Sequence, residues 1–180
     1  MLLSGGEKLQ KTIVLVVGIA LVLLLGVVYV LSNNQKQVEK EDMEQLSVET
    51  HSFKKVLAYE NEYMGNNSNM TNLFNNLPLS NYRDLVELES DTFTFVVNYN
   101  TSSDEKTVIY NATAAFVLIK NLEVIDMRFS DDSYVITREN VEQWFGDEFD
   151  SLLNPAVFKE RVQLPLKENN RTDWIDQYTT

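Results

Sequence analysis

An apolar run near the N-terminus constrains this chain more than any other feature of its sequence. Residues 13–31, IVLVVGIALVLLLGVVYVL, contain no charged and no strongly polar side chain. A helix of these 19 residues would be about 28 Å long at ~1.5 Å per residue, close to the roughly 30 Å of a bilayer's hydrocarbon core. Water is absent there, so the backbone has to satisfy its own hydrogen bonds, as a helix does. We therefore expect one transmembrane helix over residues 13–31, with the lipid bilayer as its partner.

The order of basic and apolar segments predicts an orientation, although Lys36 and Lys40 after the run balance the lysines before it. Lys8 and Lys11 precede it, in the layout of a signal-anchor: a basic segment, an apolar core and a large exported domain. We expect a cytoplasmic tail at residues 1–12 and the remainder of a single-pass cell-membrane protein on the extracellular side. The competing interpretation is cleavage after Ser32, which would release a secreted protein. The run is longer than a signal-peptide core of about 7–15 residues, and this favours a retained anchor.

The composition excludes several classes of function. With no cysteine and a single histidine, the chain cannot build a disulfide scaffold, a thiolate-ligated metal site or a multi-histidine metal site. The formal net charge is −12, and residues 1–32 carry +1, so the exported part carries −13. Nucleic acid binds to basic surfaces, because its phosphates need cationic partners. We therefore expect no nucleic-acid partner.

No arrangement of residues in the sequence points to catalysis or to a cofactor. The chain has no Gly-x-Ser-x-Gly elbow, no glycine-rich phosphate loop and no EF-hand spacing. Glu87, Glu89 and Asp91 alternate along a predicted strand, where a solvated face is a simpler interpretation than a weak calcium site. We predict a protein that is not an enzyme and that has neither cofactor nor metal. The alternative is an envelope hydrolase with a carboxylate-based site, because paired carboxylates can cleave glycosides.

Beyond the apolar run, the chain divides by composition. Residues 32–52 are almost wholly polar and predict a stalk, with His51 at its end. A lone histidine in a linker is expected to be solvated, and a pH-sensing role is the alternative. Residues 53–164 mix apolar and polar positions and predict an extracytoplasmic domain. Residues 165–180 are polar apart from one Trp-Ile pair and predict a loose C-terminal tail.

Hydrophobic periodicity predicts hairpins and helices in this domain. Alternation with a period of two indicates strands at residues 84–89, 92–99, 125–129 and 134–137. Helices are predicted at residues 69–76, 107–122, 139–145 and 150–162. Strands with one apolar face require helices packed on that face. The predicted fold class is therefore α+β, a four-stranded antiparallel sheet of two hairpins with packed helices, preceded by one transmembrane helix.

The turn Tyr63-Met64-Gly65-Asn66-Asn67-Ser68 provides the candidate site residues. Glycine and asparagine tolerate positive φ, so a tight turn is expected in which Gly65 supplies backbone freedom and Asn67 or Ser68 caps the next helix. This structural role is the first interpretation. The second is a binding loop formed by Tyr63, Gly65, Asn66, Asn67 and Ser68, because ligand sites favour loops held on a rigid scaffold.

This turn is also part of a resemblance to a known family. Together with the Leu77-Pro78 that ends the next helix and with Val97-Asn98-Tyr99 at a strand end, it resembles the bacterial family named domain of unknown function 4825. The resemblance covers roughly residues 58–150 and departs at Asn66, where an aspartate is commoner. It implies a membrane-associated protein of Gram-positive bacteria, in some members joined to regulatory or signal-transducing membrane segments. It implies no activity, cofactor or catalytic residue.

These observations favour a small α+β domain presented at the cell envelope as a non-catalytic binding or sensory and regulatory module. A cytoplasmic tail of 12 residues is too short for an output domain, so a signal would pass to a partner protein in the membrane or envelope. The candidate contacts are the turn described above and the aromatic residues Tyr82, Tyr99 and Trp144.

Overall fold

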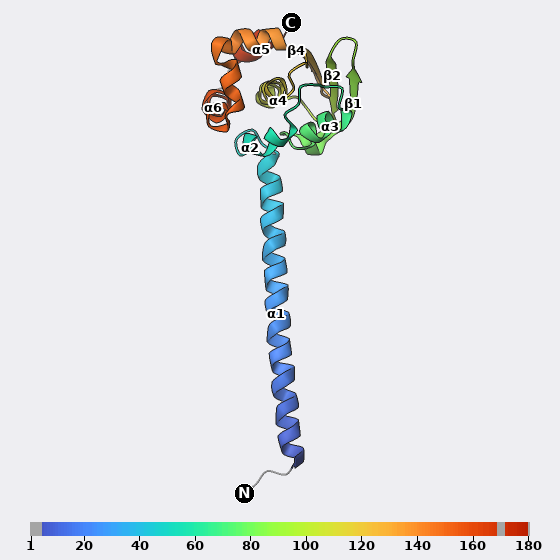
Figure 1. The fold of residues 1–180 in the computed structure, drawn as a ribbon, viewed down its shortest axis with the longest axis vertical. Helices are drawn as coiled ribbons and strands as arrows, with labels where there is room; N and C mark the ends of the chain where they lie inside the picture. The colour runs from blue at the N-terminus through green and yellow to red at the C-terminus, as the bar shows by residue number, and fades with distance from the viewer. Residues whose placement is uncertain (1–4, 169–171, 180) are drawn as a thin grey trace. The chain divides into compact units, whose positions relative to one another are not determined.

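The chain forms two compact units, Met1–Asp42 and Met43–Thr180. The computed structural model describes residues 5–168 and 172–179. Each unit has its own architecture, a single long helix in the first and a sheet with packed helices in the second (Figure 1).

The first unit is built on α1, which begins at Gly5 and ends at Gln45. Its segment Leu15–Gln37 contains an 18-residue window with a mean hydropathy of 2.9 and is, among the described residues, the one stretch long and apolar enough to cross a membrane. The apolar side chains described along it are exposed, for example Val22 at 69%. This agrees with the helix predicted over residues 13–31. Residues 1–4 of the predicted cytoplasmic tail lie outside the described residues.

The second unit contains one four-stranded sheet with the strand order β1-β2-β3-β4. The strands are β1 (Arg83–Glu89), β2 (Thr94–Tyr99), β3 (Val124–Arg128) and β4 (Ser133–Thr137). The pairs β1–β2 and β3–β4 are antiparallel hairpins, as the alternating pattern predicts. Phe95, Val97 and Ile125 are fully buried on the core face. The predicted α+β class is confirmed.

The central pair of strands corrects the prediction of a wholly antiparallel sheet. β2 and β3 run parallel, with Phe95 opposite Ile125 and Val97 opposite Met127. Between them the chain passes through α4 (Glu105–Leu118). A parallel pair needs a crossover of this kind, because both strands begin at the same end of the sheet and the chain has to return there before the second strand. The sheet is therefore mixed, with one parallel pair.

One predicted strand residue also differs. Phe93 does not lie on the buried face of β2 but precedes the strand, with a left-handed φ of 51° and 44% of its surface exposed. Its carbonyl accepts hydrogen bonds from the backbone N–H groups of Glu123 and Val124. These contacts hold Phe93 in the turn, although a bulky residue rarely adopts this backbone conformation.

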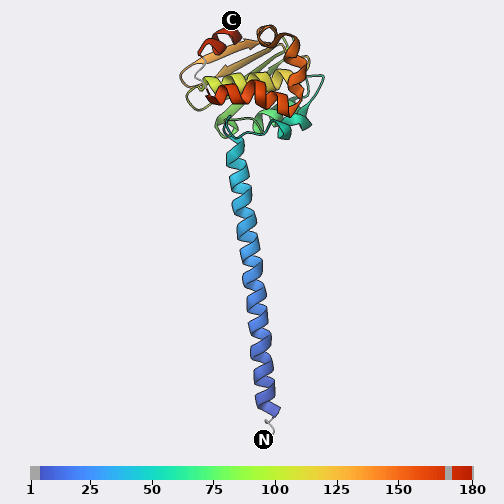
Figure 2. The same ribbon diagram turned by 90° about the vertical axis from the view of Figure 1, so that its left-hand side faces the viewer.

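α4 is the centre of the domain. Every residue from Thr107 to Leu118 is buried, and the helix lies between the sheet and the segment that contains α6 (Figures 1 and 2). Asp104 caps its N-terminus by accepting from the backbone N–H of Thr107 at 3.2 Å. At the other end, the guanidinium of Arg138 donates to the carbonyls of Phe116, Ile119 and Leu122. Both ends of this buried helix therefore have hydrogen-bond partners.

Shorter helices surround α4. On the N-terminal side they are α2 (Phe53–Val56), the 3-10 turns η1 (Leu57–Tyr59) and η2 (Ser80–Tyr82), and α3 (Asn67–Asn75). After the sheet follow α5 (Arg138–Phe145), the 3-10 helix η3 (Gly146–Leu153), α6 (Pro155–Phe158), the π-helix η4 (Lys159–Gln163), α7 (Leu164–Glu168) and α8 (Thr172–Tyr178). The single helix predicted at residues 150–162 is thus divided among three types of helix.

The C-terminal segment corrects the predicted loose tail at residues 165–180. Trp174 is 1% exposed and Tyr178 is fully buried. The Tyr178 hydroxyl lies 2.9 Å from Oγ1 of Thr113 on α4, and Trp174 stacks on Trp144. The spacing of Trp174 and Tyr178 by four residues puts both rings on one face of α8, which packs against α4 and α5. Residues 169–171 and 180 of the predicted tail lie outside the described residues.

The end of the predicted stalk at residues 32–52 is also corrected. Val48 and His51 are each 2% exposed. The side-chain amide of Gln163 donates to the carbonyls of both residues at 2.7 Å. Because buried carbonyls need partners, this amide ties the segment that follows α1 into the domain.

Candidate functional site

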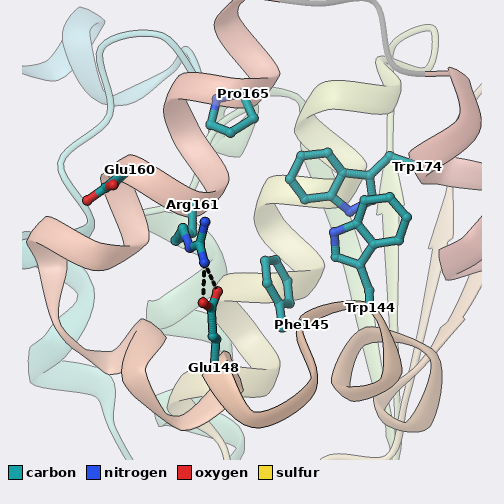
Figure 3. Close-up of a pocket in the computed structure, with 7 residues that line it drawn as sticks. All are labelled: Trp144, Phe145, Glu148, Glu160, Arg161, Pro165 and Trp174. Carbon is teal, nitrogen blue, oxygen red and sulfur yellow. Dashed lines mark hydrogen bonds and ion pairs between the residues drawn. The ribbon is translucent and has the colours of Figure 1, made fainter.

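A groove of about 390 Å³ lies among the C-terminal helices of the domain (Figure 3). We name it the indole groove. Its lining residues are Trp144, Phe145, Glu148, Glu160, Arg161, Pro165 and Trp174. They come from α5, η3, η4, α7 and α8, so the groove forms only when these elements pack together.

One wall of the groove is aromatic. The rings of Trp144 and Trp174 stack with centroids 5.2 Å apart and planes 20° from parallel, and Phe145 meets Trp174 edge to face at 6.1 Å. These are the only two tryptophans of the chain. Trp174 is buried and supports Trp144, which is half-buried and exposes part of its ring. A fixed aromatic face of this kind can hold an apolar group or a cation of a ligand.

The opposite side of the groove is polar. Nη2 of Arg161 donates to both carboxylate oxygens of Glu148, and about half of each side chain is exposed, 47% and 51%. Solvent screens such an exposed pair, so it contributes little to folding. Among the described residues, Nε and Nη1 of Arg161 have no acceptor and Glu160 has no cationic partner. These groups are accessible to a ligand.

The π-helix η4 positions the two charged residues that it contributes, Glu160 and Arg161. The backbone N–H of Leu164 donates to the carbonyl of Lys159, five residues earlier. Pro165 has no N–H and cannot donate to the carbonyl of Arg161 four residues before it, so a regular α-helix is interrupted at this point. π-helical turns of this kind are frequent at functional sites.

The turn predicted as a binding loop lies elsewhere, before α3. Tyr63 is 65% exposed, and Gly65, Asn67 and Ser68 are also exposed. Asn66 rather than Asn67 or Ser68 caps α3, because its side-chain oxygen accepts from the N–H of Asn69 at 3.1 Å. None of these turn residues lines the indole groove. Their role in ligand binding remains a prediction.

The expected requirement for glycine in this turn is not met. The φ of Gly65 is not in the left-handed region, and a Cβ at this position would meet no atom within 4 Å. The turn is held instead by side-chain oxygens: the N–H of Met64 donates to Oδ1 of Asn121 at 2.6 Å. The glycine that does need its conformational freedom is Gly146, which ends α5 with a φ of 55°.

The single histidine is buried rather than solvated. Nε2 of His51 lies 2.7 Å from the carbonyl oxygen of Asn76, and Nδ1 lies 2.7 Å from the Tyr110 hydroxyl. Since a carbonyl can only accept, Nε2 carries the proton and Nδ1 accepts from Tyr110. Burial lowers the pKa of His51 from 6.5 to about 4, although the hydrogen bond to Asn76 acts in the opposite direction. The imidazole is therefore neutral at pH 7.

Two of the aromatic residues named from the sequence lie away from the groove. Tyr82 is 45% exposed, and Tyr99 is buried in the core, stacked on Phe129. Trp144 alone of the three lines the groove. Among residues 5–168 and 172–179, no group of three histidine, cysteine, aspartate or glutamate side chains is arranged to hold a metal ion.

Sequence patterns do not reveal the rest of the groove, because the polar composition of residues 165–180 predicts a loose tail around Trp174. One signal is present in the sequence: both tryptophans occur in the last third of the chain. No local pattern brings them together, because 30 residues separate them along the chain.

Comparison with known proteins supports the family resemblance. Residues 56–139 match the family model described as a domain of unknown function (DUF4825). The resemblance predicted from the sequence is confirmed over this range, which contains the whole sheet, α3 and α4. Comparisons with curated proteins and with solved structures found no match. All seven residues that line the indole groove lie beyond residue 139, outside the matched segment.

Proposed function

We propose that this chain, which carries a DUF4825 domain and one apolar N-terminal helix, is an anchored, non-catalytic binding module of the cell envelope with a sensory or regulatory role. In this proposal α1 crosses the membrane and residues 33–180 lie outside the cytoplasm. The indole groove is the site that receives the ligand.

The observation that carries this proposal is the composition of the groove. The buried ring of Trp174 stacks on Trp144, which stays partly exposed at an accessible wall of the groove. Opposite this wall, Arg161 and Glu160 have hydrogen-bonding capacity that the described residues do not use. An apolar wall with a few convergent polar groups is the usual composition of a binding pocket.

The layout of a signal-anchor supports the orientation. Lys8 and Lys11 precede the apolar run, and the large part that follows carries −13. An anionic domain is repelled by anionic lipid headgroups, which favours a ligand-accessible domain away from the bilayer surface.

The orientation can be tested by labelling with cysteine reagents, because the natural chain contains no cysteine. Ser102→Cys introduces a thiol at an exposed position before α4, and Ser4→Cys introduces one before α1. In intact cells, a membrane-impermeant maleimide should label Ser102→Cys, whereas Ser4→Cys should react only after permeabilisation. The reverse pattern would refute the proposed orientation. Recovery of the labelled protein from the medium would indicate cleavage instead of anchoring.

The role of the groove can be tested by photo-crosslinking in intact cells. A benzophenone amino acid in place of Phe145 lies in the groove, and the same amino acid in place of Phe93, an exposed aromatic residue before β2, serves as the control. We expect a discrete adduct from position 145 and none from position 93. Equal adduct patterns at both positions, or none at position 145, would contradict the proposal.

The alternative function is an envelope hydrolase, and one observation keeps it open to experiment: two carboxylates, Glu148 and Glu160, line the groove. Glu148 is paired with Arg161, as expected of a structural or ligand-orienting carboxylate rather than of a proton donor. Release of soluble sugar or peptide from purified cell walls by the full chain, abolished in Glu160→Gln and retained in Glu168→Gln, would establish the hydrolase and overturn the binding module.

A further inference from the structure

We propose that the indole groove binds a segment of polypeptide in which an apolar side chain neighbours a lysine or an arginine. This inference rests on the proposed function of the groove as a ligand site and specifies the chemical class of its ligand.

The apolar half of the ligand would pack on the aromatic wall. The exposed part of Trp144, the edge of Phe145 and the ring of Pro165 surround the same open volume (Figure 3). None of these three groups presents a hydrogen-bond acceptor from its side chain. A side chain such as leucine would remove apolar surface from water on both partners, which is the main source of affinity at such a wall.

The basic half would be held by carboxylates and by the aromatic faces. Among the described residues, the charged groups of the groove are Glu148, Glu160 and Arg161, and one carboxylate remains after Glu148 and Arg161 pair. Figure 3 shows Glu160 at the far edge of the groove from the tryptophans, with its carboxylate directed outward and the ion pair between them. A segment that spans the groove and continues over this edge can place an ammonium or guanidinium at Glu160. The charge of −13 on residues 33–180 attracts cationic ligands and repels anionic ones at long range.

The backbone of the ligand also has a partner. Nε and Nη1 of Arg161 have no acceptor among the described residues, so they can donate to the carbonyls of an extended segment. The pair with Glu148 engages only Nη2, so Nε and Nη1 stay available for this contact.

The lining favours a peptide over a carbohydrate. Among the described residues, no amide or hydroxyl side chain lines the groove. Glu160 and Arg161 offer few partners for the many hydroxyl groups of a sugar, and unpaired polar groups are costly when they lose water. A lysine or arginine needs only the carboxylate and aromatic faces that the groove supplies.

Both tryptophans of the chain line this groove, so intrinsic tryptophan fluorescence reports on the groove alone. The experiment uses the full chain in a non-ionic polyoxyethylene detergent, which contributes neither tryptophan nor sugar. Three blocked tetrapeptides without tryptophan are titrated: Lys-Leu-Lys-Leu, Gln-Leu-Gln-Leu and Glu-Leu-Glu-Leu. A fourth titration uses the neutral oligosaccharide tetra-N-acetylglucosamine.

We expect a saturable fluorescence change with the lysine peptide, a weaker one with the glutamine peptide and none with the glutamate peptide. Glu160→Gln should weaken binding of the lysine peptide about two- to fivefold, as expected for one exposed ion pair. Glu168→Gln removes an exposed carboxylate that does not line the groove and should leave affinity unchanged. Higher salt should weaken binding of the lysine peptide more than that of the glutamine peptide.

Three outcomes would overturn the inference. Equal binding of the three peptides would refute the charge requirement, and tighter binding of the oligosaccharide would reassign the ligand class; both would leave the groove as a ligand site. No fluorescence change with any of the four ligands, together with no adduct at position 145 in cells, would remove the proposed function as well.

Discussion

Protonation of His51 provides the sharpest test of how the domain is held together. The imidazole is 2% exposed, and its two nitrogens contact the Asn76 carbonyl and the Tyr110 hydroxyl. Lys55 adds a further positive charge nearby that disfavours the charged imidazole. Acid therefore has to charge a group that the folded state keeps neutral.

The sign and the size of the effect follow from the two pKa values. The pKa of His51 is about 4 in the folded chain and 6.5 when exposed, so between these values the unfolded chain binds more protons. The contribution of the neutral His51 imidazole to the free energy of unfolding is fully present above pH 6.5 and is lost as the pH falls toward 4. The total loss is about 3 kcal/mol, of which about 2 kcal/mol is lost between pH 7 and pH 5.

The assay compares urea unfolding of the full chain with that of His51→Gln at pH 7 and at pH 5. The glutamine amide can donate to the Asn76 carbonyl but does not titrate in this range. We expect the wild-type domain to lose about 2 kcal/mol more than the variant over these two pH units. Since the chain has one histidine, its imidazole proton signals in NMR report the folded-state pKa without assignment.

Identical pH dependence in the two proteins would refute this reasoning, as would an NMR titration of the folded chain near pH 6.5. Either result would mean that His51 is solvated, as the sequence alone suggests.

Four further substitutions test the packing. Gly65→Ala should leave the free energy of unfolding unchanged or raise it by up to about 0.5 kcal/mol. Gly146→Ala should lower it by about 1–3 kcal/mol, because only Gly146 has a left-handed φ. Urea unfolding of the two variants measures this difference, and equal effects would contradict it. Gln163→Leu should lower the free energy of unfolding by about 2–4 kcal/mol, because it leaves two buried carbonyls without their donor. Amide hydrogen exchange near residues 48–51 should become faster, and unchanged exchange would count against the contact. Arg138→Met should cost about 2–3 kcal/mol by removing the donor to the carbonyls of Phe116 and Ile119 at the end of α4 and of Leu122 in the loop that follows. A thermal melt that matches wild type would disprove this capping role.

The C-terminal segment shows why sequence patterns were insufficient at the candidate site. The turn at residues 63–68 was a reasonable candidate, because its glycine and asparagines form a recognisable local pattern. The groove has no such pattern. Trp144 and Trp174 stack although 30 residues separate them along the chain. Glu160 and Arg161 are brought to the groove by the π-helix that precedes Pro165. A site assembled from five helical segments is encoded in packing rather than in spacing.

The sequence by itself determined the apolar helix, the two hairpins, the buried α4 and the resemblance to the family matched at residues 56–139. These features depend on composition and on periods of 2 and 3.6 residues, which a chain displays locally. Tertiary structure alone decided the parallel β2–β3 pair, the burial of His51 and Trp174, and the indole groove. Each of these depends on contacts between residues far apart in the chain, such as Gln163 with Val48. Such contacts stabilise the structure only after the chain has paid the entropy of bringing distant segments together, so no local pattern displays them.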